Sequence, residues 1–135
     1  MTIAPFVQGL MADDPSLEAL GITVLEALEG HSVVTLTVQP QMVNGHGITQ
    51  GGYVFALADS AFAFAANSVL EGTATTDAQI TYLAPSRVGE VLVAEAGLYF
   101  RDARRVVVDV TVRSSHRKIA LFRGTGRALR ARSTD

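Results

Sequence analysis

The sequence predicts an α+β fold in which an antiparallel sheet of about six strands wraps around one long central helix. Residues 51–68 read as a single helix, because Ala, Leu and Phe dominate the segment. This helix is apolar nearly all round, so other elements must cover most of its sides. Runs rich in Val, Thr, Ile or aromatic residues predict strands. A doubly wound fold needs several long helices, and only one segment has that length.

Shorter elements fill the rest of the chain. Residues 14–16 (Asp-Pro-Ser) predict the start of a short helix that Gly21 ends. A Glu-Gly pair at 29–30 predicts a hairpin turn, and the glycine-rich segment 44–52 predicts a loop. The predicted strands are residues 22–28, 33–38, 75–83, 90–100, 105–113 and 118–130. We expect the last four strands to form a meander with tight turns at 102–103 and 114–116.

Length and composition limit the class of protein. A chain of 135 residues leaves room for one domain over 1–135, and 48% hydrophobic residues suffice for one core. The absence of cysteine excludes disulfides and thiolate metal sites. The first twenty residues lack Lys and Arg, unlike a secretory signal, and polar residues interrupt the longest apolar run, 53–69. We therefore expect a cytoplasmic protein with no membrane partner.

Charge is distributed unevenly along the chain. Residues 1–86 carry eight acidic and no basic residues, whereas all eleven basic residues follow, although the net charge is only −2. Exposed strand faces that need charged residues would explain this pattern. The alternative is a surface for a phosphorylated ligand. Nucleic acid is not expected, because the chain as a whole is acidic and lacks interleaved aromatic and basic residues.

Asp59 is the first candidate for chemistry, because it lies in an otherwise apolar helix interior. Burial of a carboxylate costs several kcal/mol unless it is well hydrogen-bonded or its pKa rises. One explanation is structural: the carboxylate accepts hydrogen bonds from Ser60 or from a loop backbone, or it faces solvent. A general base or nucleophile is the other.

The glycine pair Gly51-Gly52 at the predicted helix start is the second candidate. Glycines there let a ligand approach the free N–H groups of the first turn, which stabilise an oxyanion by ~3–4 kcal/mol per donor. A loop that needs positive φ angles is the alternative. The spacing of Gly45, Gly47 and Gly51 does not fit a dinucleotide fingerprint.

Helix geometry adds a constraint on these two candidates. Gly51 and Asp59 are eight residues apart, which is ~12 Å along a helix axis. One small carbonyl group of a ligand cannot contact both groups of the same helix. If both act, they come from different chains. We therefore predict a homodimer with two antiparallel central helices and two composite sites.

Other catalytic signatures are missing from the sequence. There is no G-x-S-x-G nucleophile elbow. The histidines His31, His46 and His116 are scattered and lack metal-ligand spacing, so no metal site is expected.

Several segments together resemble hotdog-fold acyl-CoA thioesterases, and most closely the phenylacetic acid degradation (PaaI-like) branch. The similar segments are residues 44–63 (NGHGITQGGYVFALADSAFA), 67–68 (NS), 80–85 (ITYLAP) and 120–124 (ALFRG). The resemblance implies a sheet wrapped around one long helix, paired into dimers and usually into homotetramers. It implies hydrolysis of acyl-CoA thioesters, including aryl or arylacetyl-CoA, without a cofactor other than the CoA of the substrate.

The resemblance also implies roles for particular residues. Asp59 matches the acid that activates water or attacks the thioester, and the Gly51 N–H matches the group that polarises the carbonyl. Asn44 matches an asparagine that lines the site, and Thr75 matches a hydroxyl near the attacking water. Gln50 stands where the family often has His; Gln can donate a hydrogen bond but cannot become a cation near neutral pH.

The substrate itself would meet two further groups of residues. Arg101, Arg104 and Arg105 come together in one predicted turn and are candidates for the CoA phosphates, as are Arg117 and Lys118 in the neighbouring turn. Gly52 is also expected to contact the substrate. Phe55, Phe62 and Tyr82 are candidates for the acyl pocket. Ordinary core packing is the alternative for each aromatic residue.

Two other functions fit the same fold. A non-catalytic acyl-CoA-binding domain would hold the ligand without hydrolysis, but it leaves a buried Asp59 unexplained. A hotdog hydratase pairs an Asp with a His soon after it, and here no His follows Asp59 until His116. The sequence thus favours an acyl-CoA thioesterase.

Overall fold

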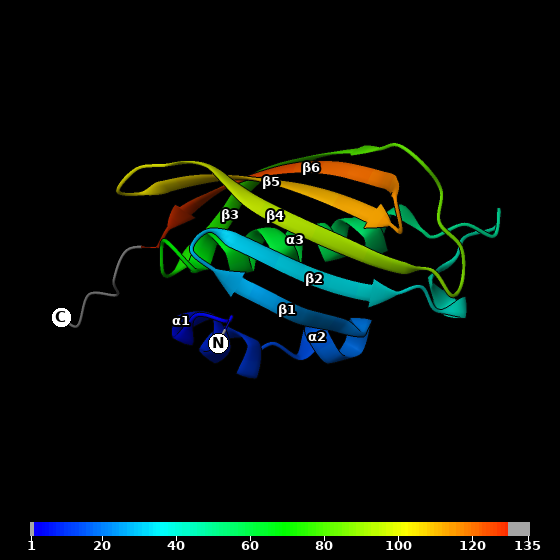
Figure 1. The fold of residues 1–135 in the computed structure, drawn as a ribbon, viewed down its shortest axis with the longest axis horizontal. Helices are drawn as coiled ribbons and strands as arrows, with labels where there is room; N and C mark the ends of the chain where they lie inside the picture. Colours follow the sequence, from blue (N-terminus) through cyan, green and yellow to red (C-terminus); the bar gives the residue numbers. More distant parts are fainter. Residues whose placement is uncertain (1, 130–135) are drawn as a thin grey trace.

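The computed structural model describes residues 2–129, which form one six-stranded antiparallel sheet that curves around a central helix (Figure 1). The helices are α1 (Pro5–Ala12), α2 (Pro15–Leu20), η1 (Pro40–Met42, a 3-10 turn) and α3 (Gly51–Asn67). The strands are β1 (Ile22–Leu28), β2 (His31–Thr37), β3 (Thr73–Tyr82), β4 (Val91–Arg101), β5 (Arg105–Ser114) and β6 (Arg117–Ala128). The predicted fold class is confirmed. Within residues 2–129 no helix is long and apolar enough to cross a membrane.

The strand order β1-β2-β4-β5-β6-β3 corrects the expected meander of the last four strands. β4, β5 and β6 are consecutive neighbours, but β3 pairs with β6 at the far edge of the sheet. The connection 83–90 is too long for a tight hairpin and carries β4 across to β2. Among the last four strands, the tendency of consecutive strands to pair therefore fails between β3 and β4.

The tight turns form at the positions that the sequence predicts. Glu29 and Gly30 both have positive φ angles (53° and 81°), as a two-residue hairpin between β1 and β2 requires. Gly21 ends α2 in the left-handed conformation with φ 70°. The sequence pattern does not predict α1, because Gly9 interrupts it and no capping side chain marks its start.

The core lies between α3 and the concave face of the sheet, and α3 contacts all six strands. Leu57, Ala58, Ala61 and Ala65 on α3 have no exposed surface. The three alanines let the helix backbone approach the sheet closely. Gly124 on β6 faces α3 at this contact. A Cβ added at Gly124 would lie 2.6 Å from the Phe62 ring, so a larger residue would not fit.

The two edges of the sheet differ. The N-terminal segment covers β1, since the Ala4 N–H donates to Ala27 O at 2.8 Å, the Ala27 N–H donates to Thr2 O at 2.8 Å, and α1 and α2 lie beside this strand (Figure 1). The other edge, β3, pairs only with β6 among the described residues, and most of its side chains are exposed. An uncovered strand of ten residues is a surface for pairing with another strand.

A β-bulge in β3 changes the direction of its side chains. The register shifts between Thr75 and Asp77, so Thr75 lies opposite Gly126 and Ala78 lies opposite Gly124. Both partners belong to the buried face of β6, which places Thr75 and Ala78 on the face toward α3. Without the extra residue, one of them would point outward. The bulge thus turns a hydroxyl toward the central helix.

Candidate active site

The loop before α3 presents backbone N–H groups at the start of the helix. Asn44 N–H donates to Ile48 O (2.8 Å), and Gly47, with φ 74°, donates to Asn44 O (2.9 Å), so the loop closes on itself. Gln50 N–H is occupied by Met42 O at 2.8 Å. Within residues 2–129 no carbonyl accepts from the N–H groups of Gly51 or Gly52. These two N–H groups remain available to an oxyanion.

The Asn44 side chain is fixed in the same loop. Its Oδ1 accepts a hydrogen bond from the His46 N–H at 2.9 Å, which leaves the Nδ2 group as a donor. Asn44 is half-buried and lines the same cavity as Gly51. In this position the Asn44 amide can orient a carbonyl or a water molecule beside the start of α3. His46, whose N–H supports this geometry, has an exposed side chain.

An apolar cavity of about 440 Å³ lies beside the Gly51 end of α3. Its lining residues are Asn44, Ile48, Thr49, Gly51, Val54, Tyr82, Leu83, Ala84, Pro85, Ser86 and Ile119. Tyr82 is half-exposed and its hydroxyl donates to Gly51 O at 2.9 Å, which ties the mouth of the cavity to the first helical residue. The volume suits an acyl group rather than a whole CoA molecule.

Asp59 lies at mid-helix, half-buried, on the face of α3 that the sheet covers least. Gly52, Phe55, Ala56, Asp59 and Ala63 share this face by their helical spacing, and all keep some exposed surface. Burial raises the pKa of the Asp59 carboxyl, and a hydrogen-bonding interaction with the Thr75 side chain opposes that rise. A carboxyl with a raised pKa beside a hydroxyl is suited to accept a proton.

The structure does not bring Asp59 to the cavity that Gly51 and Asn44 share. None of the cavity's lining residues is Asp59 or Thr75. Within one chain the predicted site residues therefore fall into two groups at different points of α3, with Asn44 and Gly51 in one group and Asp59 and Thr75 in the other.

The remaining predicted pocket residues separate into two groups. Phe62 is 1% exposed and packs near Phe122, at 6.2 Å between ring centroids, so it belongs to the core. Phe55 is half-buried and meets Phe122 edge-on at 5.4 Å. Gln50 caps the start of α3 without a side-chain hydrogen bond, and its side chain is exposed.

The predicted arginine turn lies at the opposite end of α3. Arg101 donates to Val69 O at 2.6 Å, just after the helix, and Arg105 donates to Asp102 at 2.9 and 3.2 Å. The backbone N–H groups of Arg104 and Arg105, together with the Arg105 guanidinium, lower the pKa of Asp102 to about 2. Within residues 2–129 the Arg104 guanidinium has no hydrogen-bond partner.

A cavity of about 450 Å³ opens at this turn, lined by Asp102, Ala103, Arg104, Arg105 and Arg127. Arg127 comes from β6 and adds a guanidinium that sequence spacing alone does not associate with the turn. Three arginines against one carboxylate leave this cavity with a net positive charge, which suits phosphate groups.

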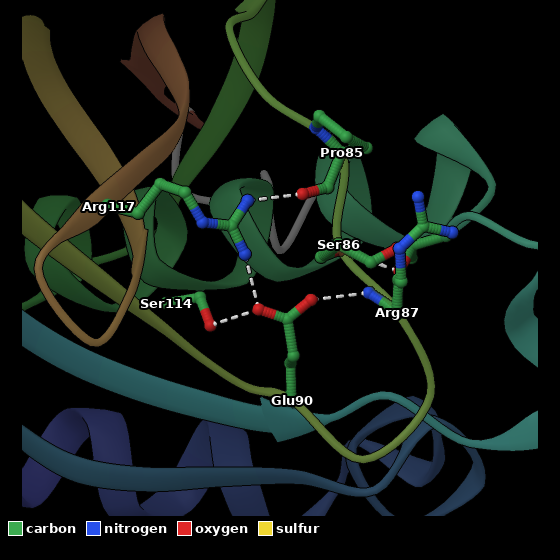
Figure 2. Close-up of polar contacts among 7 residues, drawn as sticks. Pro85, Ser86, Arg87, Glu90, Ser114 and Arg117 are labelled. Atoms are coloured by element: carbon green, nitrogen blue, oxygen red, sulfur yellow. Dashed lines mark hydrogen bonds and ion pairs between the residues drawn. The ribbon is translucent and has the colours of Figure 1, made fainter.

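Arg117 does not join that arginine group. Its guanidinium hydrogen-bonds to Pro85 O and pairs with Glu90, at the end of the sheet that carries the apolar cavity (Figure 2). The sequence gives no signal for this contact, because Glu90 and Arg117 are separated by 27 residues. The sequence also does not identify Val54 and Ile119 as cavity residues, because their spacing is that of ordinary core residues.

Comparison with known proteins identifies the family. The model of the thioesterase superfamily matches residues 46–120. The acyl-coenzyme A thioesterase PaaI of Escherichia coli K12 is 39% identical over 113 residues, covering 83% of this chain and 81% of that protein. A putative esterase of Archaeoglobus fulgidus is 35% identical over 84% of this chain and 74% of its own.

Solved structures agree with the sequence matches. The structure of E. coli PaaI, from the phenylacetic acid degradation operon, superposes with a TM-score of 0.87 at 35% identity, covering 92% of this chain and 91% of that one. A mutant PaaI of Thermus thermophilus gives 0.83 at 35% identity, over 86% of this chain and 100% of that one. A Streptococcus mutans protein solved with acetyl-CoA bound gives 0.75 at 26% identity, over 83% and 91%. The chain thus belongs to the thioesterase superfamily and is a hotdog-fold acyl-CoA thioesterase of the PaaI-like branch.

Proposed function

We propose that this acyl-CoA thioesterase hydrolyses aryl- or arylacetyl-CoA thioesters, such as phenylacetyl-CoA, at sites composed of two subunits. The observation that carries the proposal is the half-buried Asp59 on an otherwise apolar helix, with the Thr75 hydroxyl beside it. A carboxylate held there without a cationic partner opposes folding, so a role in chemistry explains its presence.

The proposed reaction uses groups that the chain itself supplies. The thioester carbonyl accepts a hydrogen bond from Gly51 N–H, while Asn44 orients the carbonyl or the water. Asp59 either removes a proton from water, which adds to the carbonyl carbon, or attacks that carbon itself to give an anhydride that water then opens. In both routes the C–S bond breaks, CoA leaves as a thiolate that takes up a proton, and the acyl group leaves as the free acid.

The shape of the apolar cavity supports the aryl preference. Ile48, Val54, Leu83 and Ile119 provide apolar walls, and the Tyr82 ring lies at the mouth. The similar E. coli protein comes from the phenylacetic acid degradation operon. An arylacetyl group is of the size and polarity that such a cavity would accept. The cavity lies at the Gly51 end, so the acyl group enters beside the N–H that polarises its carbonyl.

Dimerisation would unite the two halves of the site. β3 is the uncovered edge of the sheet, and antiparallel pairing with its copy would continue the sheet across the two subunits. The same twofold axis would set two α3 helices antiparallel against each other on the half-exposed Phe55–Asp59–Ala63 face. Asp59 would then approach Gly51 of the partner subunit. Pairs of such dimers would give the homotetramer that the family resemblance implies.

The CoA moiety would extend from the thioester toward the arginine turn. In an antiparallel pair, the Arg104 end of one subunit lies on the same side as the Gly51 end of the other. Arg104 and Arg127 can then pair with the phosphates of a substrate whose acyl group occupies the partner's cavity. The S. mutans relative solved with acetyl-CoA supports binding of this class of ligand.

The first prediction concerns chemistry. Asp59→Asn should lower thiol release from phenylacetyl-CoA by about 10²–10⁴-fold, because the variant keeps the shape but loses the base or nucleophile. Asp13→Asn, at an exposed position after α1, is the matched control and should keep full activity. A wild type that binds the thioester but releases no thiol would favour the non-catalytic acyl-CoA-binding domain instead.

The second prediction concerns stability and pH. The pKa of Asp59 is raised in the folded state, so its ionised form opposes folding above that pKa and its neutral form does not. At pH 7 the Tm of Asp59→Asn should exceed that of the wild type by a few degrees. The difference should vanish as the pH falls to about 4, the ordinary pKa of Asp. Thermal unfolding across this range measures it, and a wild type that is the more stable at pH 7 would contradict it.

The third prediction concerns the CoA phosphates. Arg104→Ala should raise KM for an acyl-CoA by about 10-fold, the loss expected for one charge-assisted hydrogen bond. The same variant should leave KM for the matching acyl-pantetheine thioester unchanged, because that substrate carries no ADP moiety. Equal effects on both substrates would remove Arg104 from the phosphate site.

A further inference from the structure

The connection between β3 and β4 forms one wall of the apolar cavity. Leu83, Ala84, Pro85 and Ser86 all line it, although they belong to neither a helix nor a strand. The first two N–H groups of this connection, those of Leu83 and Ala84, donate to Ile119 O on β6 at 2.8 and 3.3 Å, and no strand ladder continues beyond them within the described residues. Its position therefore depends on the contacts that its own residues make with the rest of the molecule.

Glu90 and Arg117 hold this connection at Pro85 and at Arg87 (Figure 2). Arg117 uses one guanidinium nitrogen for Pro85 O and the other for the Glu90 carboxylate. Glu90 also accepts from the Ser114 hydroxyl at 2.8 Å and from the Arg87 N–H at 2.5 Å. Ser114 and Arg117 are paired at the turn between β5 and β6, so the connection is fastened to a rigid hairpin.

The ionised state of Glu90 favours the same arrangement. The Ser114 hydroxyl, the Arg87 N–H and the Arg117 guanidinium lower the pKa of Glu90, and its slight burial only partly opposes them. The carboxylate is therefore ionised at neutral pH. An isolated exposed ion pair stabilises little, but this pair also carries three hydrogen bonds to separate parts of the chain.

The same wall is linked to the start of α3. Ser86 is 2% exposed, and its carbonyl accepts from the Thr49 N–H at 2.8 Å. The two hydroxyls lie 2.6 Å apart. Thr49 precedes Gly51 by two residues, so any displacement of the wall would reach the N–H group that polarises the thioester.

We propose that Glu90 and Arg117 act as a positioning pair, which fixes the 83–86 wall against the Gly51 end of α3 and thereby sets which acyl groups are hydrolysed. Neither residue lines the cavity, so neither is expected to touch the substrate. The inference rests on the proposed acyl pocket. A short acyl group reaches little of the wall, whereas a bulky one packs against it. Loss of the pair should therefore harm bulky substrates most.

The test compares Arg117→Met with Arg123→Met. Arg123 lies on the same strand and makes a two-bond ion pair with Asp109 (2.6 and 2.8 Å), but on the outer face of the sheet. The readout is kcat/KM for phenylacetyl-CoA divided by kcat/KM for acetyl-CoA, a ratio that does not depend on the fraction of active enzyme. Arg117→Met should lower this ratio about 10-fold, within the range that pocket contacts give. Arg123→Met should leave it unchanged.

Conservative variants separate positioning from folding. Arg117→Lys keeps a cation for Glu90 but lacks the fork that reaches Pro85 O, so the ratio should fall between those of the wild type and Arg117→Met. Glu90→Gln keeps the acceptor oxygen for Ser114 and removes the charge, and it should shift the ratio in the same direction. Equal losses for both thioesters in all three variants would show a role in folding only and would overturn the proposal.

Amide hydrogen exchange tests the positioning without catalysis. Exchange in residues 47–53 and 83–87 should quicken in Arg117→Met and stay at the wild-type rate in Arg123→Met. Unchanged exchange in both variants would overturn the proposal. If the wild type hydrolyses no thioester, the proposed function fails, and the exchange rates still decide whether this pair fixes the wall.

Discussion

Burial of a carboxylate on α3 is the constraint on which the proposed site depends. The Asp59 side chain is half-buried by its neighbours, and only the Thr75 hydroxyl acts to keep its pKa down. The Gly51 N–H that would stabilise an oxyanion lies ~12 Å away along the same rigid helix. Since a helix cannot bend these groups together, the proposed reaction would need a second copy of the helix, and with it an open strand edge and an uncovered helix face.

The sheet meets these needs through two local departures from regularity. The bulge at Thr75 turns a hydroxyl toward Asp59 while it keeps Ala78 and Ile80 on the core side. The connection 83–90 takes β3 out of sequence order and leaves it as the free edge. The same connection then becomes a wall of the acyl cavity. This crossing connection thus contributes both to the strand order and to the cavity.

Sequence alone predicts the parts of this fold that local chemistry determines. The long Ala-rich helix, the Glu29-Gly30 turn and the out-of-place Asp59 are each visible in a short window of residues. The position of β3 is not, because it depends on pairing with a strand about 45 residues later. Nor are the Glu90–Arg117 pair and the contact of Arg127 with the arginine turn, since each joins distant segments. Phe62 is a residue for which the sequence suggests too much: it is a candidate for the acyl pocket, but in the structure it packs into the core because Gly124 leaves room for its ring.

Subunit complementation tests the composite site most directly. Gly51→Pro removes the N–H in question, at a helix position that tolerates proline, after a residue whose ψ of 131° suits it. It also adds a ring beside Tyr82, since a Cβ at this position would lie 3.0 Å from the Tyr82 hydroxyl oxygen. Asp59→Asn removes the acid. Each variant alone should be nearly inactive. Refolded together in equal amounts, they should recover about one quarter of wild-type thioester hydrolysis, because half the dimers are mixed and each holds one intact site. A mixture as inactive as its parents would show that both residues act within one chain.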